Sequence, residues 1–319
     1  MQRYIVRRIA SAIPVLLIVS MLAFGGMELV PGGPIYAYLG ANPESASLTG
    51  AQLQELKHQY GLDQSLPVRY VRWLDRAVHW DFGASIRTKQ PVTKAIGERL
   101  TVSLWLSGIT FVVHIIVGLS LGVLAGVKRG TKVDFGATSL AVFGSATPSF
   151  WLAILLIVLF AVNLGWFPAS GWVDPIKDPS GAFKHLVLPV VSLGVFGSAT
   201  VMRQTRSSVV EVMSEDYVRT ARAKGTAERL VIWRHVLKNS LLPVVTVMAW
   251  LLAGLVSGSV LIERVFALPG IGRLAVDATS GDDYPVIQGI VLLSATAIIC
   301  ANLLADVTYT LLDPRIRPK

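Results

Sequence analysis

The stretch DYVRTARAKGTAERLVIWRHVLKNSLLP, residues 216–243, is a charged segment placed between two long apolar runs. From Arg203 to Ser240 the chain carries eight Lys or Arg and four Asp or Glu. Apolar residues recur at helical spacing on both sides of Gly225, and glycine adopts the backbone of a sharp turn without steric cost. We therefore predict a helix, a turn and a second helix, followed by a membrane helix that opens at Leu242-Pro243.

The rest of the chain is unusually apolar. Of its 319 residues, 53% are hydrophobic and 15% are charged, and the mean hydropathy is +0.58. In soluble domains about a quarter of the residues are charged, whereas a transmembrane helix needs about 20 mostly apolar residues. The composition predicts an all-α polytopic membrane protein with six transmembrane helices. The six apolar runs are Ile9–Val30, Val102–Val127, Gly136–Leu164, Leu186–Val201, Leu241–Ile262 and Pro285–Leu311.

The net charge of +9 follows membrane topology and gives no support to a nucleic-acid partner. Lys and Arg are enriched in cytoplasmic loops and flanks of up to about 60 residues. A topology of six spans with both termini in the cytoplasm places the charged segment and most basic residues of the short loops on the cytoplasmic side. The outer loop 31–99 is too long for the rule to apply to it. The other inside residues are Arg3, Arg7, Arg8, Lys128, Arg129, Lys132, Arg315, Arg317 and Lys319.

The N-terminal run, residues 1–30, imitates a signal peptide in its basic start and apolar centre. Its length and the lack of a clear cleavage site in ELVPGGP predict a retained first helix. The outer loop 31–99 has apolar residues at helical spacing on both sides of Leu62–Pro67, which predicts two short amphipathic helices. Two interpretations of this loop stay open: a packed extracellular cap and a docking surface for an external partner.

Glycines four residues apart occur in the second and fifth apolar runs. In lipid, this spacing lets helix backbones approach closely. We predict helix-packing seams, within this chain or with a partner, at Gly118, Gly122 and Gly126 and at Gly254 and Gly258.

Ionisable residues inside a membrane are costly and are frequently functional. The candidates are His114, Glu28 and Asp306, and for His114 a hydrogen-bonded structural role is favoured over a direct functional one. The single cysteine, Cys300, is expected to be a small core residue. The five histidines are dispersed along the sequence, so nothing in it suggests a catalytic triad or a metal site.

Three explanations compete for the charged segment. It could be a basic loop held near anionic lipid, a nucleic-acid-binding element without the expected aromatic residues, or a rigid element pressed into a partner protein. The sequence contains no phosphate-binding loop of the form G-x-x-x-x-G-K-[ST]. We therefore expect that the chain does not use ATP itself.

The charged segment resembles the cytoplasmic EAA loop of permease subunits of binding-protein-dependent ABC importers. Against the pattern Glu-Ala-Ala, three residues, Gly, the sequence RTARAKG matches at Ala221 and Gly225, while Arg219 and Thr220 replace Glu and the first Ala. The Leu-Pro pair ending at Pro243 also lies farther from the glycine than in the general pattern. Both departures are similar to the dipeptide and oligopeptide branch, where EDYVRTARAKG followed by RHVLKNSLLP is characteristic.

The resemblance extends over nearly the whole chain, and the long first outer loop is similar to that of the B-type permease. It implies the type I ABC importer permease fold and a multi-pass location in a prokaryotic inner membrane. It also implies half of a channel, completed by a homologous second permease, in contact with membrane lipid. The stretches that carry it are MQRYIVRRI, WDFGASIRTKQPV, TPSFWLAILLIVLF with LGWFPASGW, GSVLIERVFALPGIGRLAVDAT, DYPVIQG and LLDPRIRPK.

By the same resemblance, two ATPase subunits or domains hold ATP and Mg, while this chain binds no cofactor or metal and is not an enzyme. An extracytoplasmic binding protein delivers the substrate. The contacts expected for that protein are Asp81, Phe82, Gly83, Trp172 and Gly270. The ATPase-coupling residues implied are Glu215, Asp216, Tyr217, Arg219, Thr220, Ala221, Arg222, Ala223, Lys224 and Gly225.

Within that coupling element, Ala221 and Ala223 are expected to permit close docking and Gly225 to make the turn. The three basic residues Arg219, Arg222 and Lys224 are expected to pair with acidic groups of the ATPase.

We expect four parts: a first transmembrane helix (1–30), an outer loop domain (31–99), a permease core (100–311) containing the loop 203–240, and a tail (312–319). Di- or oligopeptides are the substrates that the resemblance implies. Nickel, haem or another small solute stays open as an alternative, and so does a proton-coupled secondary carrier.

Overall fold

The computed structural model describes residues 2–29, 35, 50–59, 61–256 and 259–312. Helices dominate this part of the chain, and its β-pairing is limited to one bridge between Ala84 and Pro91. The predicted all-α class is therefore confirmed. The expected seam residue Gly258 and nearly all of the predicted tail lie outside the described residues.

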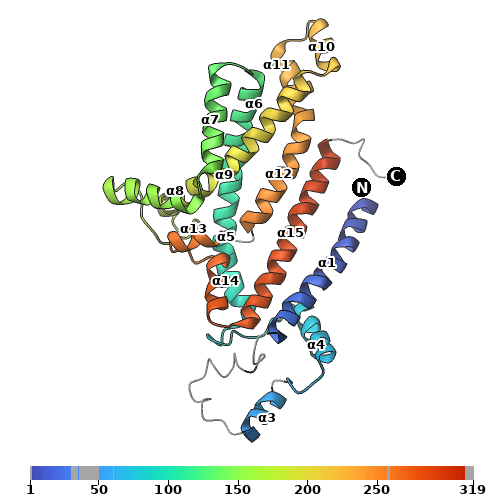
Figure 1. The fold of residues 1–319 in the computed structure, drawn as a ribbon, viewed down its shortest axis with the longest axis vertical. Coiled ribbons are helices and arrows are strands. Elements are labelled where there is room, and N and C mark those ends of the chain that lie inside the picture. The colour runs from blue at the N-terminus through green and yellow to red at the C-terminus, as the bar shows by residue number, and fades with distance from the viewer. Residues whose placement is uncertain (1, 30–34, 36–49, 60, 257–258, 313–319) are drawn as a thin grey trace.

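Within the described residues, five continuous helices are long and apolar enough to cross a membrane, and a bent pair would make a sixth span. Figure 1 shows them as a bundle of roughly aligned rods. The five are α1 (Gln2–Glu28), α5–η2–α6 (Val92–Val113, His114–Leu119, Ser120–Val127), α9 (Pro179–Met213), α11–η4–α12 (Glu228–Leu230, Val231–Leu237, Lys238–Val256) and α15 (Tyr284–Leu312); η marks π-helical turns.

The third predicted span, Gly136–Leu164, is not one straight helix. It consists of α7 (Lys132–Ala146), α8 (Ser149–Leu156) and η3 (Ile157–Asn163), with a bend of 99° between the two parts. Pro148 explains the break, because it disfavours helical backbone at Thr147, which is extended with φ −85° and ψ 119°. In Figure 1, α8 turns sideways out of the bundle.

The fourth and fifth predicted spans have different bounds from the helices that contain them. Helix α9 continues to Met213, well beyond the predicted Val201. The fifth helix runs without a break over Glu228–Val256, so the second helix of the charged segment and the membrane span are one rod. Pro243 therefore lies inside α12 and not in a first turn, and no backbone N–H is available there for the Asn239 carbonyl.

Helix α9 is the centre of the bundle. It packs against α5, α6, α7, α8 and α12 and is the most buried of the long helices. Its contact with η2 and α6 is made along the glycine series of the second span. A Cβ atom on Gly118 would lie 2.6 Å from Val201 Cβ, one on Gly122 would lie 2.5 Å from Thr205 Cβ, and one on Gly126 would lie 2.7 Å from Val209 Cγ1. Gly254 has open space around it and makes no such seam in this chain.

Substituting Gly122 by valine should strongly destabilise the bundle, because the new side chain meets Thr205 and the Met202 carbonyl at 2.8 Å. Overpacking of this kind costs about 1–3 kcal/mol, and more where backbone must move. The measurement is the melting temperature of the purified chain in detergent. Gly136→Val on α7, where a Cβ meets nothing within 4 Å, is the matched control and should melt close to wild type.

The two ends of the bundle differ in character. At one end lie α10 (Asp216–Ala223), the α6–α7 connection and the free ends of α1 and α15, and at the other lie α3 (Gly50–Gln59) and α4 (Leu66–Val78) (Figure 1). The two predicted outer-loop helices are thus present. Helix α4 is held to α1 by the packing of Tyr70 and Trp73 on the ring of Phe24, with ring centres 5.6 Å apart in each case.

Cys300 is not a core residue. Its side chain is exposed on α15, although it lies within that apolar helix as expected. A position on the outer surface of a membrane helix and one in its core share the same apolar neighbours in sequence, so the local pattern does not separate them.

Candidate functional site

The predicted coupling element forms a short, well-anchored helix. Glu215 has extended backbone before α10, and Asp216 places a negative charge in its first turn, which favours the helix dipole. Val218 and Ala221 are buried in a cluster with Val209 of α9 and with two valines of η4, Val231 and Val236. The apolar side of α10 therefore fixes it onto the two long helices that it connects.

Gly225 ends α10 in the left-handed conformation, with φ at +77°. Its N–H donates to the Arg222 carbonyl at 2.9 Å, and the Thr226 N–H donates to the Ala221 carbonyl at 3.3 Å. These two bonds form a Schellman cap, which satisfies carbonyls left open at a helix end. A Cβ at Gly225 would meet nothing within 4 Å, so the glycine serves the backbone and not the packing.

A salt bridge closes the turn from the other side. Arg222 donates to Glu228 through Nε at 3.0 Å and through Nη2 at 2.7 Å. The hydrogen bonds to this carboxylate raise the pKa of Arg222 above its ordinary value. Arg222 was expected to pair with an ATPase, but within this chain it has its own acidic partner.

The outward face of α10 combines small residues with charges. Thr220 and Ala223 are exposed near its centre and are flanked by the exposed Asp216, Arg219 and Lys224. Arg219 lies 3.7 Å from Asp216 and leaves most of its side chain accessible. At the edge, the Tyr217 hydroxyl accepts a hydrogen bond from Asn239 Nδ2 at 3.0 Å. Ala221, expected to permit docking, instead faces the chain's own core.

Exchanging the charges of Arg222 and Glu228 tests whether Arg222 acts within the turn or on an acidic group of another protein. We expect Arg222→Glu to reduce ATP-driven uptake several-fold, because it places two carboxylates across the turn. Adding Glu228→Arg should restore most of the uptake, since the reversed pair closes the turn equally well. Uptake by the single and double variants in proteoliposomes is the measurement. If the double variant stays as poor as the single one, Arg222 acts on an external acidic group.

Sequence reasoning missed two features at this end of the molecule. Asp134 of α7 is buried and accepts from Arg206 Nε at 2.5 Å and Nη2 at 2.8 Å, which ties α7 to α9. Their separation of 72 residues leaves no local signal. Leu230 and Trp233 are exposed next to the turn, with Trp233 64% accessible.

The polar membrane candidates have different surroundings. Glu28 is bound by both terminal nitrogens of Arg69, at 2.5 and 3.0 Å, which ties α1 to α4. Asp306 of α15 accepts from Arg8 of α1 at 3.0 Å. Both carboxylates thus hold α1 in place, whereas His114 lies beside a cavity. No group of three or more His, Cys, Asp or Glu suitable for a metal occurs in the described part of the chain.

The residues expected to contact a binding protein do not form one surface. Asp81 is exposed, and its Oδ1 accepts from the Gly83 N–H at 2.9 Å, with Phe82 partly covered between them. Trp172 packs partly against the core. Gly270 is buried, which argues against its expected exposure: a Cβ there would lie 2.3 Å from the carboxyl carbon of Glu263.

Glu263 is fully buried and organises the segment around Gly270. Ser103 Oγ donates to its Oε1 at 2.9 Å, and the Arg273 N–H donates to its Oε2 at 2.8 Å. Ser103 in turn accepts from the Ile271 N–H at 2.8 Å. One carboxylate thereby joins α5, α13 (Val260–Val265) and the start of α14 (Ile271–Ser280).

Comparison with solved structures first defines the fold. A chain of the MetNI methionine ABC transporter, in an inward-facing conformation, matches with a TM-score of 0.56 and 18% sequence identity, over 68% of this chain and 96% of that chain. At this identity the match shows the fold alone. The fold is that of an ABC-transporter permease.

Sequence comparison then identifies the family. Residues 118–318 match the binding-protein-dependent transport system inner membrane component, and residues 1–107 match the N-terminal region of such membrane components. The chain belongs to this family. It is 43% identical to a putative peptide transport system permease protein of Brucella abortus (strain 2308), over 99% of both chains. It is 40% identical to the glutathione transport system permease protein GsiC of Salmonella paratyphi A, over the full length of both.

Proposed function

We propose that this chain is the permease subunit of an ATP-driven importer that takes up di- or oligopeptides. It would form half of a transmembrane channel with a homologous second permease, in a prokaryotic inner membrane, with six spans and both termini in the cytoplasm. Two ATPase subunits or domains would supply energy, and an extracytoplasmic binding protein would deliver the solute. The names of the two relatives support a peptide as the solute.

The observation that carries the proposal is the construction of α10. A short helix is fixed by Val218 and Ala221 to the two long helices that flank it, while its opposite face of small and charged residues is left uncovered. A face of this kind suits docking of another protein, because small residues allow close approach and charges fix the orientation. Energy could thus enter through α10 without any ATP site in this chain.

The six-span topology has two supports. The free ends of α1 and α15 lie at the same end of the bundle as α10 (Figure 1). The same end also carries the basic residues Lys128, Arg129 and Lys132 and the charged segment, as the positive-inside rule requires of a cytoplasmic face. The bent pair α7–α8 would count as the third span.

The test is ATP hydrolysis by the complete complex in lipid: this chain, its partner permease, the ATPases and the binding protein. Dipeptides, longer peptides, haem and nickel are added in turn, and a complex without binding protein is the control. We expect stimulation by peptides only, and only with the binding protein present. Stimulation by haem or nickel alone would contradict the assignment of peptides as the solute. A complex with no ATPase response would favour a secondary carrier.

A further inference from the structure

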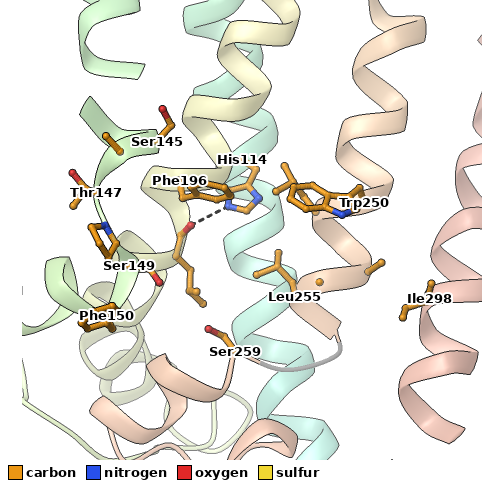
Figure 2. A pocket seen from close by; sticks show the side chains of 16 residues that line it. His114, Ser145, Thr147, Ser149, Phe150, Phe196, Trp250, Leu255, Ser259 and Ile298 are labelled. Atoms are coloured by element: carbon orange, nitrogen blue, oxygen red, sulfur yellow. Dashed lines mark hydrogen bonds between the residues drawn. The ribbon is translucent and has the colours of Figure 1, made fainter. Parts of the chain in front are cut away.

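A large cavity lies at membrane depth, where the bend of the α7–α8 pair faces α9 and α12. Its volume is about 770 Å³, within the range of about 300–1,000 Å³ that is usual for small-molecule sites. Figure 2 shows its walls converging from η2, the α7–α8 bend, α9, α12 and α15. Within the described part of the chain, no Asp, Glu, Lys or Arg lines it.

His114 is the most deeply buried polar group of the wall, with 2% of its surface accessible. Its Nε2 lies 3.4 Å from the Leu193 carbonyl, and its Nδ1 has no hydrogen-bond partner among the described residues. Space for the ring is made by Gly197 of α9, where a Cβ would lie 2.2 Å from the imidazole. His114 also opens the π-helical turn η2, and such turns are frequent at functional sites.

The unsatisfied nitrogen has a definite hydrogen-bonding character. An imidazole that donates from Nε2 to the Leu193 carbonyl carries its lone pair on Nδ1, which then accepts and cannot donate. Buried polar atoms are nearly always paired, so a buried, unpaired acceptor in a residue that lines a cavity points to a ligand that brings a donor. The complementary group is an N–H.

The other residues of the cavity wall indicate the chemistry of the rest of the ligand. Ser149 and Ser259 add hydroxyl groups, while Phe150, Phe196 and Trp250 supply flat apolar surface. Figure 2 shows Phe196, His114 and Trp250 among the residues that line this cavity. A ligand that fits is uncharged at its centre, carries amide N–H and C=O groups, and has apolar side chains.

We propose that this cavity is an intramembrane subsite for the transported peptide, in which His114 Nδ1 accepts a hydrogen bond from a backbone amide N–H of the solute. The inference rests on the proposed function, because it takes the solute to be a peptide. Uncharged walls give weak contacts, and weak contacts let a solute leave the site again as transport requires.

The test compares Ala-Ala with its ester isostere alanyl-lactate, which lacks the amide N–H, in uptake by the complete reconstituted complex. Uptake of each solute is measured with wild type and with His114→Leu, so any preference of the unchanged binding protein cancels in the ratio. We expect His114→Leu to lower Ala-Ala uptake about two- to tenfold, the worth of one hydrogen bond, with little effect on the ester. His114→Asn, which keeps an acceptor, should recover most of the difference.

Thr110→Val is the matched control, because Thr110 lies one turn earlier on the same helix, is equally buried, and is not part of the cavity wall. Thr110→Val should leave the uptake of both solutes unchanged. An equal fall of both solutes in His114→Leu would give His114 a structural role and overturn the proposal. A wild-type complex that imports neither solute would instead overturn the peptide function itself.

A second measurement does not depend on uptake by the histidine variants. Ser149→Cys, in a chain that also carries Cys300→Ser, is labelled with a maleimide in the complete complex. The reference is Ser214→Cys in the same background, because Ser214 is exposed beyond the end of α9 and lies outside the cavity wall. During turnover, Ala-Ala should slow labelling at residue 149 and not at residue 214. Labelling at 149 that Ala-Ala does not slow would contradict solute occupancy of the cavity.

Discussion

Replacing Gly225 by glutamate is expected to reduce ATP-driven uptake at least 30-fold while leaving the chain in the membrane. The backbone at this position has φ at +77°, which costs an L-residue roughly 1–2 kcal/mol and loosens the cap of α10. The new carboxylate also stands beside Lys224, on the face proposed to dock the ATPase. Disturbing a charged protein contact costs about 2–5 kcal/mol, which corresponds to the expected loss. The measurements are uptake, stimulated ATP hydrolysis and the amount of chain in the membrane fraction.

Gly130→Glu provides a matched control for this substitution. Gly130 has nearly the same backbone, with φ at +78°, is equally free of neighbours, and lies in the α6–α7 connection at the same end of the bundle. The same residue change there applies the same strain and charge away from α10. It should keep most of the uptake. Wild-type uptake by Gly225→Glu, or equal loss in both variants, would refute the role given to α10.

The second large effect is expected at Glu263, where alanine should destabilise the folded chain by about 3 kcal/mol. Removing the carboxylate leaves the Arg273 N–H and the Ser103 hydroxyl without their acceptor in a buried place. Unpaired buried donors cost about 1–3 kcal/mol each. Glu263→Gln should have an intermediate effect, since its amide supplies one acceptor and one unwanted donor. Thermal unfolding of the purified chain in detergent measures both.

Glu98→Ala is the control for Glu263, because Glu98 is exposed on α5 and its removal buries no unpaired group. Its melting temperature should stay close to that of wild type. If Glu263→Ala also melts like wild type, the carboxylate does not hold α13 and α14 to α5. In that case the Glu263→Ala variant would give no information about how the outer end of the molecule is arranged.

The sequence predicts well those features that depend on neighbouring residues. The periodic apolar positions on both sides of Gly225 predict two helices, and the glycine between them predicts the turn. Pro148 carried a local signal for the bend of the third span, but the long apolar run around it suggested a single straight helix. The start of the fifth helix was misplaced for the opposite reason: Pro243 suggested a helix start, whereas the helix continues through it.

Features built from distant residues had no local signal. Arg222 and Glu228 are six positions apart across a turn, a spacing that no helical pattern contains. Gly270 was expected to contact a binding protein because of the resemblance to the permease family, yet the buried Glu263 lies against it inside the molecule. The wall around His114 is assembled from segments between residues 114 and 298, so only the folded chain reveals that His114 lines a cavity and that its Nδ1 is unpaired among the described residues.

The glycine series of the second span also limits which motions are open to the molecule. Val201, Thr205 and Val209 each sit over one glycine at a four-residue repeat, so a small slide of α9 along this seam would drive each side chain into the neighbouring backbone. The next register that again places these side chains over glycines is four residues away, about 6 Å along the helix axis. Sliding is thereby removed as a degree of freedom, and these two helices travel as one body. Any change of shape during a transport cycle must then come from rotation of that body as a whole, or from displacement of α1, α12 and α15 around it.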